Sequence, residues 1–154
     1  MKKLTFVQDL PLTQQQAWEF FSSPKNLNEI TPADMHFQML DELPDGMYAG
    51  MFIRYRITPL LRIPMYWVTE ITHIREGVFF IDEQRSGPYK IWHHEHHFAA
   101  IPGGVRMTDI LYYDIGLGPL GWLAGKWFVH RQVQHIFDYR YKRLQQLFPG
   151  EGKG

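Results

Sequence analysis

The chain has 154 residues, of which 45% are hydrophobic and 16% aromatic, and that length suits one domain with one core. Lys plus Arg and Asp plus Glu balance at 16 each, so no strong field favours nucleic acid or an anionic membrane. The absence of cysteine excludes disulfides, thiolate nucleophiles and cysteine-based zinc sites. No stretch approaches the roughly 18 apolar residues of a membrane span, and no signal peptide precedes the first strand. We therefore expect a cytoplasmic protein with no membrane span.

The first fifth of the chain predicts one strand and two short helices. Residues 4–10 form the strand. Thr13 is followed by Gln16 at the spacing of a capping box, which predicts a helix beginning there. A second short helix begins at Ser23-Pro24 and ends before Thr31-Pro32, because a residue that precedes proline avoids the helical region.

The middle of the chain predicts an antiparallel meander. Strands are expected at residues 36–43, 50–58, 65–74, 78–85, 90–101 and 105–115. Within residues 50–58, Ile53 and Tyr55 alternate with Arg54 and Arg56, which indicates a sheet with water on one face. Turn sequences separate the strands at short intervals, as is typical of hairpins rather than crossover units.

The last part of the chain predicts a long amphipathic helix. Glycine-rich residues 116–121 are interpreted as a flexible gate before a helix over residues 120–148, which Pro149 ends. Arg140 is interpreted as one of several cations near the C-terminal end of that helix. We predict one α+β domain over residues 1–148, in which a curved sheet of six to seven strands wraps around the helix. Residues 149–154 are predicted to be a disordered tail.

The most unusual segment is the histidine-rich stretch over residues 92–98. On a strand, Trp92, His94, His96 and Phe98 share one face, and His93, Glu95 and His97 share the other. The aromatic residues at both ends predict that the first set faces the interior. His94 and His96 would then lie about 7 Å apart at their Cα atoms, while the second set forms a solvated face.

Two interpretations of the inward histidines remain open. They are hydrogen-bonding groups whose ring nitrogens pair with Asp109, Asp82 or water, or they bind a metal with Asp109, Asp82 or Gln84 as third ligand. We favour the first, so no metal and no cofactor are predicted. Asp109 lies among apolar residues and could hold a histidine in one tautomer, which makes His94, His96 and Asp109 the candidate catalytic residues.

The predicted pocket combines these polar groups with large aromatic side chains. The expected ligand-binding residues are Tyr55, Trp67, Asp82, Gln84, Trp92, His94, His96, Asp109, Tyr113 and Trp127.

Four pieces of the sequence resemble a known family: residues 80–98 (FIDEQRSGPYKIWHHEHHF), 103–109 (GGVRMTD), 118–121 (GPLG) and 136–140 (IFDYR). In these pieces the chain is similar to the SRPBCC superfamily of START-like, polyketide-cyclase-like, helix-grip proteins, and within it to the bacterial stand-alone ligand-binding SRPBCC domains. The resemblance implies a helix-grip fold with a cavity between sheet and helix that accepts lipids, polyketides or other apolar molecules. It implies no single reaction.

Three functions follow as hypotheses. The favoured one is binding of a small hydrophobic molecule whose polar end is fixed by His94, His96, Asp109 and Gln84. The second is a cyclase, dehydratase or hydrolase that uses a histidine–aspartate pair. The third is a protein-interaction module, which an exposed patch at Trp122, Trp127 and Phe128 would favour.

Overall fold

A computed structural model describes residues 1–60, 63–116 and 118–150, with the side chains of these ranges except those at 59–60 and 118–126. Its strands are β1 (Lys2–Leu10), β2 (Gln38–Met39), β3 (Met51–Leu60), β4 (Ile63–Arg75), β5 (Phe79–Ser86), β6 (Ile91–Ile101) and β7 (Gly104–Asp114). Its helices are α1 (Gln14–Phe21), the 3₁₀ helices η1 (Pro24–Ile30) and η2 (Ala33–Met35), and α2 (Gly118–Leu147). In these ranges no helix combines the length and the hydropathy that crossing a membrane requires.

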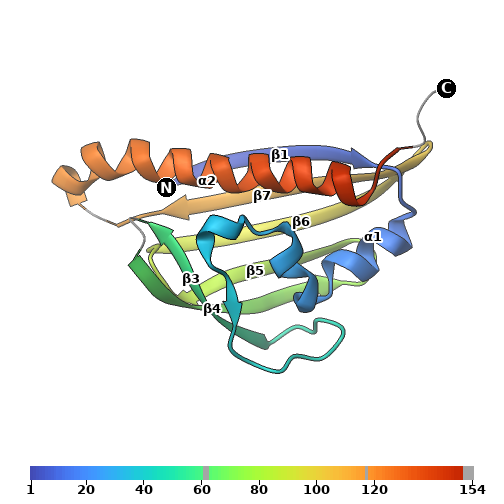
Figure 1. Ribbon diagram of the computed structural model, residues 1–154, viewed down its shortest axis with the longest axis horizontal. Coiled ribbons are helices and arrows are strands. Elements are labelled where there is room, and N and C mark those ends of the chain that lie inside the picture. The colour runs from blue at the N-terminus through green and yellow to red at the C-terminus, as the bar shows by residue number, and fades with distance from the viewer. Residues whose placement is uncertain (61–62, 117, 151–154) are drawn as a thin grey trace.

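The strands form one antiparallel sheet in the order β1-β7-β6-β5-β4-β3-β2. Figure 1 shows α2 running along the sheet near β1 and β7, with α1 at one end. The predicted α+β architecture is therefore confirmed. Because a curved sheet cannot bury its inner face by itself, α2 supplies the second layer of the core.

Two apolar clusters fill the space between the layers. In the first, Val133 and Phe137 of α2 pack with Leu111 and Tyr113 of β7. Phe137 also stacks on Phe6 of β1, with ring centroids 3.9 Å apart. The second cluster, at the end covered by α1, comprises Leu10, Ala17, Trp18, Phe21, Ile30, Phe80, Phe98, Val105, Met107 and Leu144.

Local sequence signals account for several elements. Thr13 and Gln16 form the predicted capping box: the Gln16 N–H donates to Thr13 Oγ1 and the Thr13 N–H donates to Gln16 Oε1. In β3 the predicted alternation is confirmed, because Ile53 and Tyr55 are buried whereas Arg54 is exposed.

Two predicted boundaries are wrong. The strand expected over residues 36–43 is reduced to β2. It cannot begin at His36, because His36 adopts a left-handed backbone conformation (φ 45°) at the end of η2. The gate expected over residues 116–121 is mostly helix, since α2 begins at Gly118. Pro119 is tolerated there, because the first N–H groups of a helix have no intrahelical acceptor. Residue 117 of the gate and residues 151–154 of the tail lie outside the described residues.

Gly104 marks a close approach between β7 and the end of β1. A Cβ atom at Gly104 would collide with the backbone carbonyl oxygen of Leu10, whereas a Cβ at Gly46 would meet nothing within 4 Å. We expect Gly104→Ala to lower the free energy of unfolding by about 1–3 kcal/mol through overpacking, as measured by urea denaturation. Gly46→Ala is the control, and equal effects of the two substitutions would contradict this account of the β1–β7 edge.

Candidate functional site

Strand register brings four polar side chains to the inner face of the sheet. Asp82 of β5 lies opposite His94 of β6, and His96 lies opposite Asp109 of β7. Residues that face each other across an antiparallel pair share one face, as do residues two apart on a strand. His94 and His96 are each 5% exposed and Asp109 is 1% exposed. The prediction that both histidines face inward is therefore confirmed.

Each carboxylate lies against both imidazole rings. Asp109 Oδ1 is 3.1 Å from His94 Nε2 and 2.8 Å from His96 Nδ1, while Asp82 Oδ2 is 2.8 Å from His96 Nε2 and 3.5 Å from His94 Nδ1. The His94 Nε2–Asp109 and His96 Nε2–Asp82 contacts are hydrogen bonds. His96 Nδ1 has no hydrogen-bond partner among the described residues despite its short distance to Asp109, so that contact is electrostatic. All four ring nitrogens thus face a carboxylate oxygen.

Arg140 of α2 completes this group, which we call the polar cluster: Asp82, His94, His96, Asp109 and Arg140. Arg140 is 8% exposed, its Nη1 lies 3.7 Å from Asp109 Oδ1, and its guanidinium lies over the ring of Phe21. Its Nε has no hydrogen-bond partner among the described residues. Arg140 is a site residue that the sequence analysis missed. Its spacing of three from Phe137 and four from Leu144, on the buried stripe of the helix, was the signal that could have found it.

The cluster shifts the pKa values of its members in opposite directions. Burial raises the pKa of a carboxyl group, yet the charge of Arg140 and the contacts with both histidines hold the pKa of Asp109 well below its usual value. The pKa of Asp82 is also lowered, because its hydrogen bond with His96 and nearby positive charge outweigh burial. Burial and the neighbouring His96 lower the pKa of His94, whereas contacts with Asp109 and Asp82 overcome burial and raise the pKa of His96.

The polar cluster lies at the wall of an internal cavity of about 150 Å³. Six of the predicted ligand-binding residues line it: Tyr55, Trp67, Asp82, Trp92, His94 and His96. Arg140, Tyr89 and Phe137, none of which was predicted, line it as well. Sheet and helix therefore both contribute to the wall.

Four predicted residues are placed elsewhere. Asp109 contacts the histidines but is not among the cavity-lining residues. Gln84 donates to the backbone carbonyl of Tyr89 (2.5 Å) and accepts from its N–H (3.2 Å), which fixes the preceding turn. The Tyr113 hydroxyl pairs with His130 Nδ1 at 3.2 Å.

Trp127 corrects the prediction most clearly. It is 66% exposed, on the outer side of α2, where Arg131 lies over its ring. Helical position decided this, because Trp127 lies six residues from Val133 and so points away from the buried stripe. Phe128 is also exposed, at 40%, and the side chain of Trp122 lies outside the described ones.

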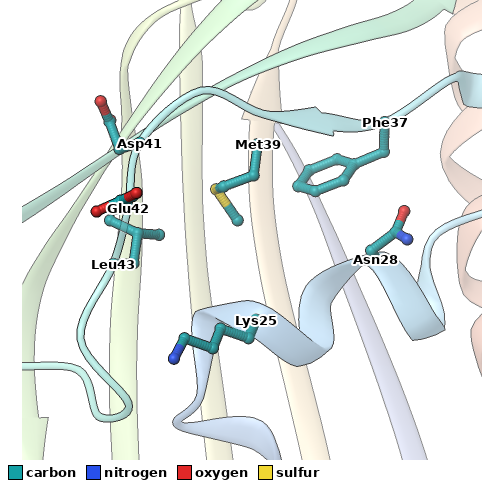
Figure 2. A pocket seen from close by; sticks show the side chains of 7 residues that line it. All are labelled: Lys25, Asn28, Phe37, Met39, Asp41, Glu42 and Leu43. Carbon is teal, nitrogen blue, oxygen red and sulfur yellow. The ribbon is translucent and has the colours of Figure 1, made fainter.

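A larger hollow of about 530 Å³ opens on the surface beside the cavity. It is lined by Lys25, Asn28, Phe37, Met39, Asp41, Glu42 and Leu43. Figure 2 shows Phe37 and Met39 next to each other above η1, which carries Lys25 and Asn28. Phe37 also lines the internal cavity, so its ring is a wall that the two spaces share.

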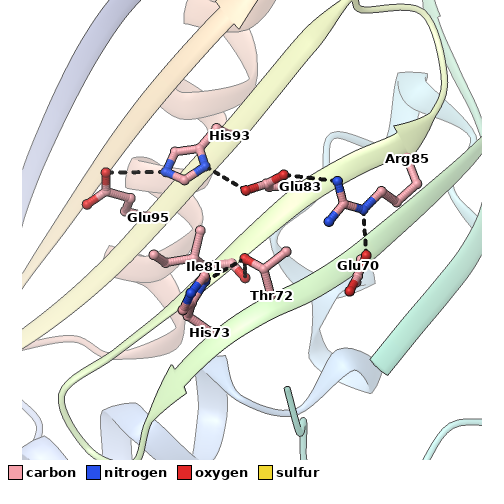
Figure 3. A network of polar contacts seen from close by, with 8 residues as sticks. All are labelled: Glu70, Thr72, His73, Ile81, Glu83, Arg85, His93 and Glu95. Atoms are coloured by element: carbon pink, nitrogen blue, oxygen red, sulfur yellow. Dashed lines mark hydrogen bonds and ion pairs between the residues drawn. The ribbon is translucent and has the colours of Figure 1, made fainter. Parts of the chain in front are cut away.

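The opposite face of β6 carries a separate, partly exposed network. His93 pairs with Glu83 through Nδ1 at 3.1 Å and with Glu95 through Nε2 at 3.4 Å, and Figure 3 shows these contacts beside the Arg85 pairs. His97 Nε2 lies 2.8 Å from Glu95. These residues form the solvated face that the sequence predicts.

Comparison with known proteins finds similarity in structure alone. No protein-family model and no curated protein matches the chain. Protein CV1439 from Chromobacterium violaceum matches with a TM-score of 0.70 at 10% identity, over 97% of this chain and 98% of that one. Protein Ms6760 from Mycobacterium smegmatis matches with a TM-score of 0.68 at 17% identity, over 94% and 89%.

A third match names the fold. Ara h 8.0201 matches with a TM-score of 0.59 at 14% identity, over 94% of this chain and 98% of that one. The chain has the Bet v1-like helix-grip fold. The fold that the sequence resemblance implies is thereby confirmed. Identities this low carry the helix-grip fold and no activity, so the function must be argued from the site.

Arg140 gives the first test of the polar cluster. Arg140→Met keeps an unbranched side chain but removes the cation beside the fully buried Asp109, so we expect a loss of about 3 kcal/mol in the free energy of unfolding. The surface pair of Arg106 and Asp9 supplies the control, because Arg106→Met breaks an ion pair that water screens. Urea denaturation would contradict the role of Arg140 by showing equally small losses for both variants.

Proposed function

We propose that the protein binds a small, largely apolar molecule with an oxygen acceptor in the internal cavity. The observation that carries this is a pair of buried donors on cavity-lining residues. Trp67 Nε1 and Arg140 Nε have no hydrogen-bond partner among the described residues. A buried donor without a partner costs about 1–3 kcal/mol. A side-chain adjustment that brings either donor to a ligand oxygen in the cavity would relieve that cost.

The aromatic wall supports a flat ligand. Trp67 packs with Tyr55, Tyr89 and Trp92, with ring centroids 5.8, 5.5 and 5.2 Å apart. Packed rings hold one another in place, so this side of the cavity is preformed and loses little conformational entropy on binding. Such a surface favours stacking with planar, apolar compounds.

The volume of the cavity limits the size of the ligand. About 150 Å³ equals the space of an engineered protein cavity that binds benzene, and it is well below the roughly 300–1,000 Å³ of drug-sized pockets. A single-ring compound fits this space. Lipids and polyketides, which the family resemblance suggests, would fit only after the wall moves.

The acid–base alternative lacks a free base. A general base needs a nitrogen that can accept a proton from the substrate. Both nitrogens of His94 and of His96 already lie within 3.5 Å of a carboxylate oxygen of Asp82 or Asp109. The geometry therefore favours binding over acid–base catalysis by these two rings.

The ligand test compares acetophenone with ethylbenzene, two single-ring compounds of similar shape that differ in the carbonyl oxygen. We expect acetophenone to bind more tightly, and Trp67→Phe to weaken acetophenone about 3- to 10-fold without weakening ethylbenzene. Isothermal titration calorimetry measures both. Trp127→Phe is the matched control on the surface, because Trp127 is 66% exposed.

Native mass spectrometry on protein purified without organic solvent tests the proposal without a chosen probe. A bound mass of single-ring size supports it. Binding of hexadecanoic acid but of neither aromatic compound would contradict the proposed ligand class, and no change in acetophenone affinity in Trp67→Phe would contradict the role of the indole N–H.

Phe37 marks the route of access that we propose, because it lines both the surface hollow and the cavity. A bulkier ring would obstruct this route without touching the polar cluster. We expect Phe37→Trp to slow ligand association at least several-fold in stopped-flow measurements. An unchanged association rate would place the access route elsewhere.

A further inference from the structure

We propose that Asp82, His94 and His96 form a binding site for a divalent transition-metal ion at the cavity wall, with Asp109 as its outer support. This goes beyond the proposed function and does not depend on it. The ligand atoms would be Asp82 Oδ2, His94 Nδ1 and His96 Nε2.

The spacing of these atoms suits a metal. One ligand atom from each residue can be chosen so that all three lie within 4.8 Å of one another. Asp82 Oδ2 is 2.8 Å from His96 Nε2 and 3.5 Å from His94 Nδ1. Ligands at about 2.0–2.1 Å from a tetrahedral ion are about 3.3 Å apart, so small side-chain adjustments would complete the site.

With both imidazoles neutral, the hydrogens of the polar cluster do not match its contacts. Four contacts of 3.5 Å or less join the two rings to the two carboxylates, and a carboxylate oxygen only accepts. Two neutral imidazoles carry two N–H groups, which leaves two contacts with a nitrogen lone pair against an anionic oxygen. The longest of the four contacts is His94 Nδ1 to Asp82 Oδ2, at 3.5 Å.

A metal ion on the Asp82 side balances all four contacts. His94 Nδ1 and His96 Nε2 would then direct their lone pairs at the ion. Their remaining nitrogens would carry the hydrogens: His94 Nε2 would donate to Asp109 Oδ1 at 3.1 Å, and His96 Nδ1 lies 2.8 Å from the same oxygen in an electrostatic contact. A carboxylate behind a metal-binding histidine is the usual outer support, since it fixes the ring orientation.

Burial and charge select Asp82 over Asp109 as the ligand. Asp82 lines the cavity, whereas Asp109 is almost fully buried and already faces Arg140. Three protein ligands leave at least one position open, and Asp82, His94 and His96 all line the cavity. Two imidazoles and one carboxylate without thiolate suit Zn²⁺, Fe²⁺, Co²⁺ or Ni²⁺.

The experiment uses the full chain after dialysis against EDTA, with Zn²⁺ binding followed by calorimetry and Co²⁺ binding followed by visible absorption. We expect one equivalent to bind. Asp82→Asn should weaken the affinity at least about 10-fold, the loss that follows removal even of an outer-shell carboxylate. The double variant His93→Gln/His97→Gln is the control, because it removes two histidines from the opposite face of the same strand, of which Figure 3 shows His93.

Broadening of histidine NMR signals by Co²⁺ tests the wild-type protein directly, whether or not Asp82→Asn folds. Selective broadening of the His94 and His96 ring signals supports the site. Lack of saturable binding by the wild-type protein, or loss of binding in the His93/His97 variant with retention in Asp82→Asn, would overturn it. Either outcome is independent of acetophenone binding, so failure of the metal site and failure of the proposed function remain distinguishable.

Discussion

Two carboxylates buried against two histidines and one arginine are the constraint on which the inner face of this protein depends. An isolated buried carboxylate costs several kcal/mol, so Asp109 is stable only because His94, His96 and Arg140 surround it. His94 and His96 come from β6, Asp109 comes from the adjacent strand β7, and Arg140 comes from α2. The polar cluster therefore ties sheet to helix, as do the hydrogen bonds from Gln8 to the Tyr141 carbonyl and between Tyr113 and His130, in a layer held mainly by non-directional apolar packing.

The cavity is the space that the apolar side chains of the sheet and of α2 leave unfilled. Aromatic rings of β3, β4 and β6 and of the turn before β6 support one another, and Phe137 of α2 covers them. Trp67 Nε1 and Arg140 Nε, on two residues that line this space, are buried without a hydrogen-bond partner among the described residues. The same cavity thus combines a packed aromatic wall with buried polar groups, and the proposed binding of a flat ligand rests on this combination.

Parts of the site were predictable because strand periodicity is local. Parity along β6 was enough to place His94 and His96 inside and His93 and His97 outside, and alternation in β3 placed Tyr55. Helix periodicity also carries this information, because within α2 Arg140 lies on the buried stripe and Trp127 does not. The prediction that Trp127 lines the pocket overlooked it. The role of Gln84 could not be predicted from strand alternation. Its side-chain amide hydrogen-bonds the backbone carbonyl and N–H of Tyr89, and this contact depends on how the turn between them folds.

The amino-acid sequence by itself determined the elements and their faces, because capping residues, turn residues and side-chain alternation act over a few neighbouring positions. That is why the sheet, the long helix and the inward histidines follow from it. Only the tertiary structure decided the register of these neighbouring strands, and hence that Asp82 and Asp109 each face both histidines. Cavity volume and the approach of Arg140 also depend on how sheet and helix pack, and those distances arise from contacts between residues far apart in the chain.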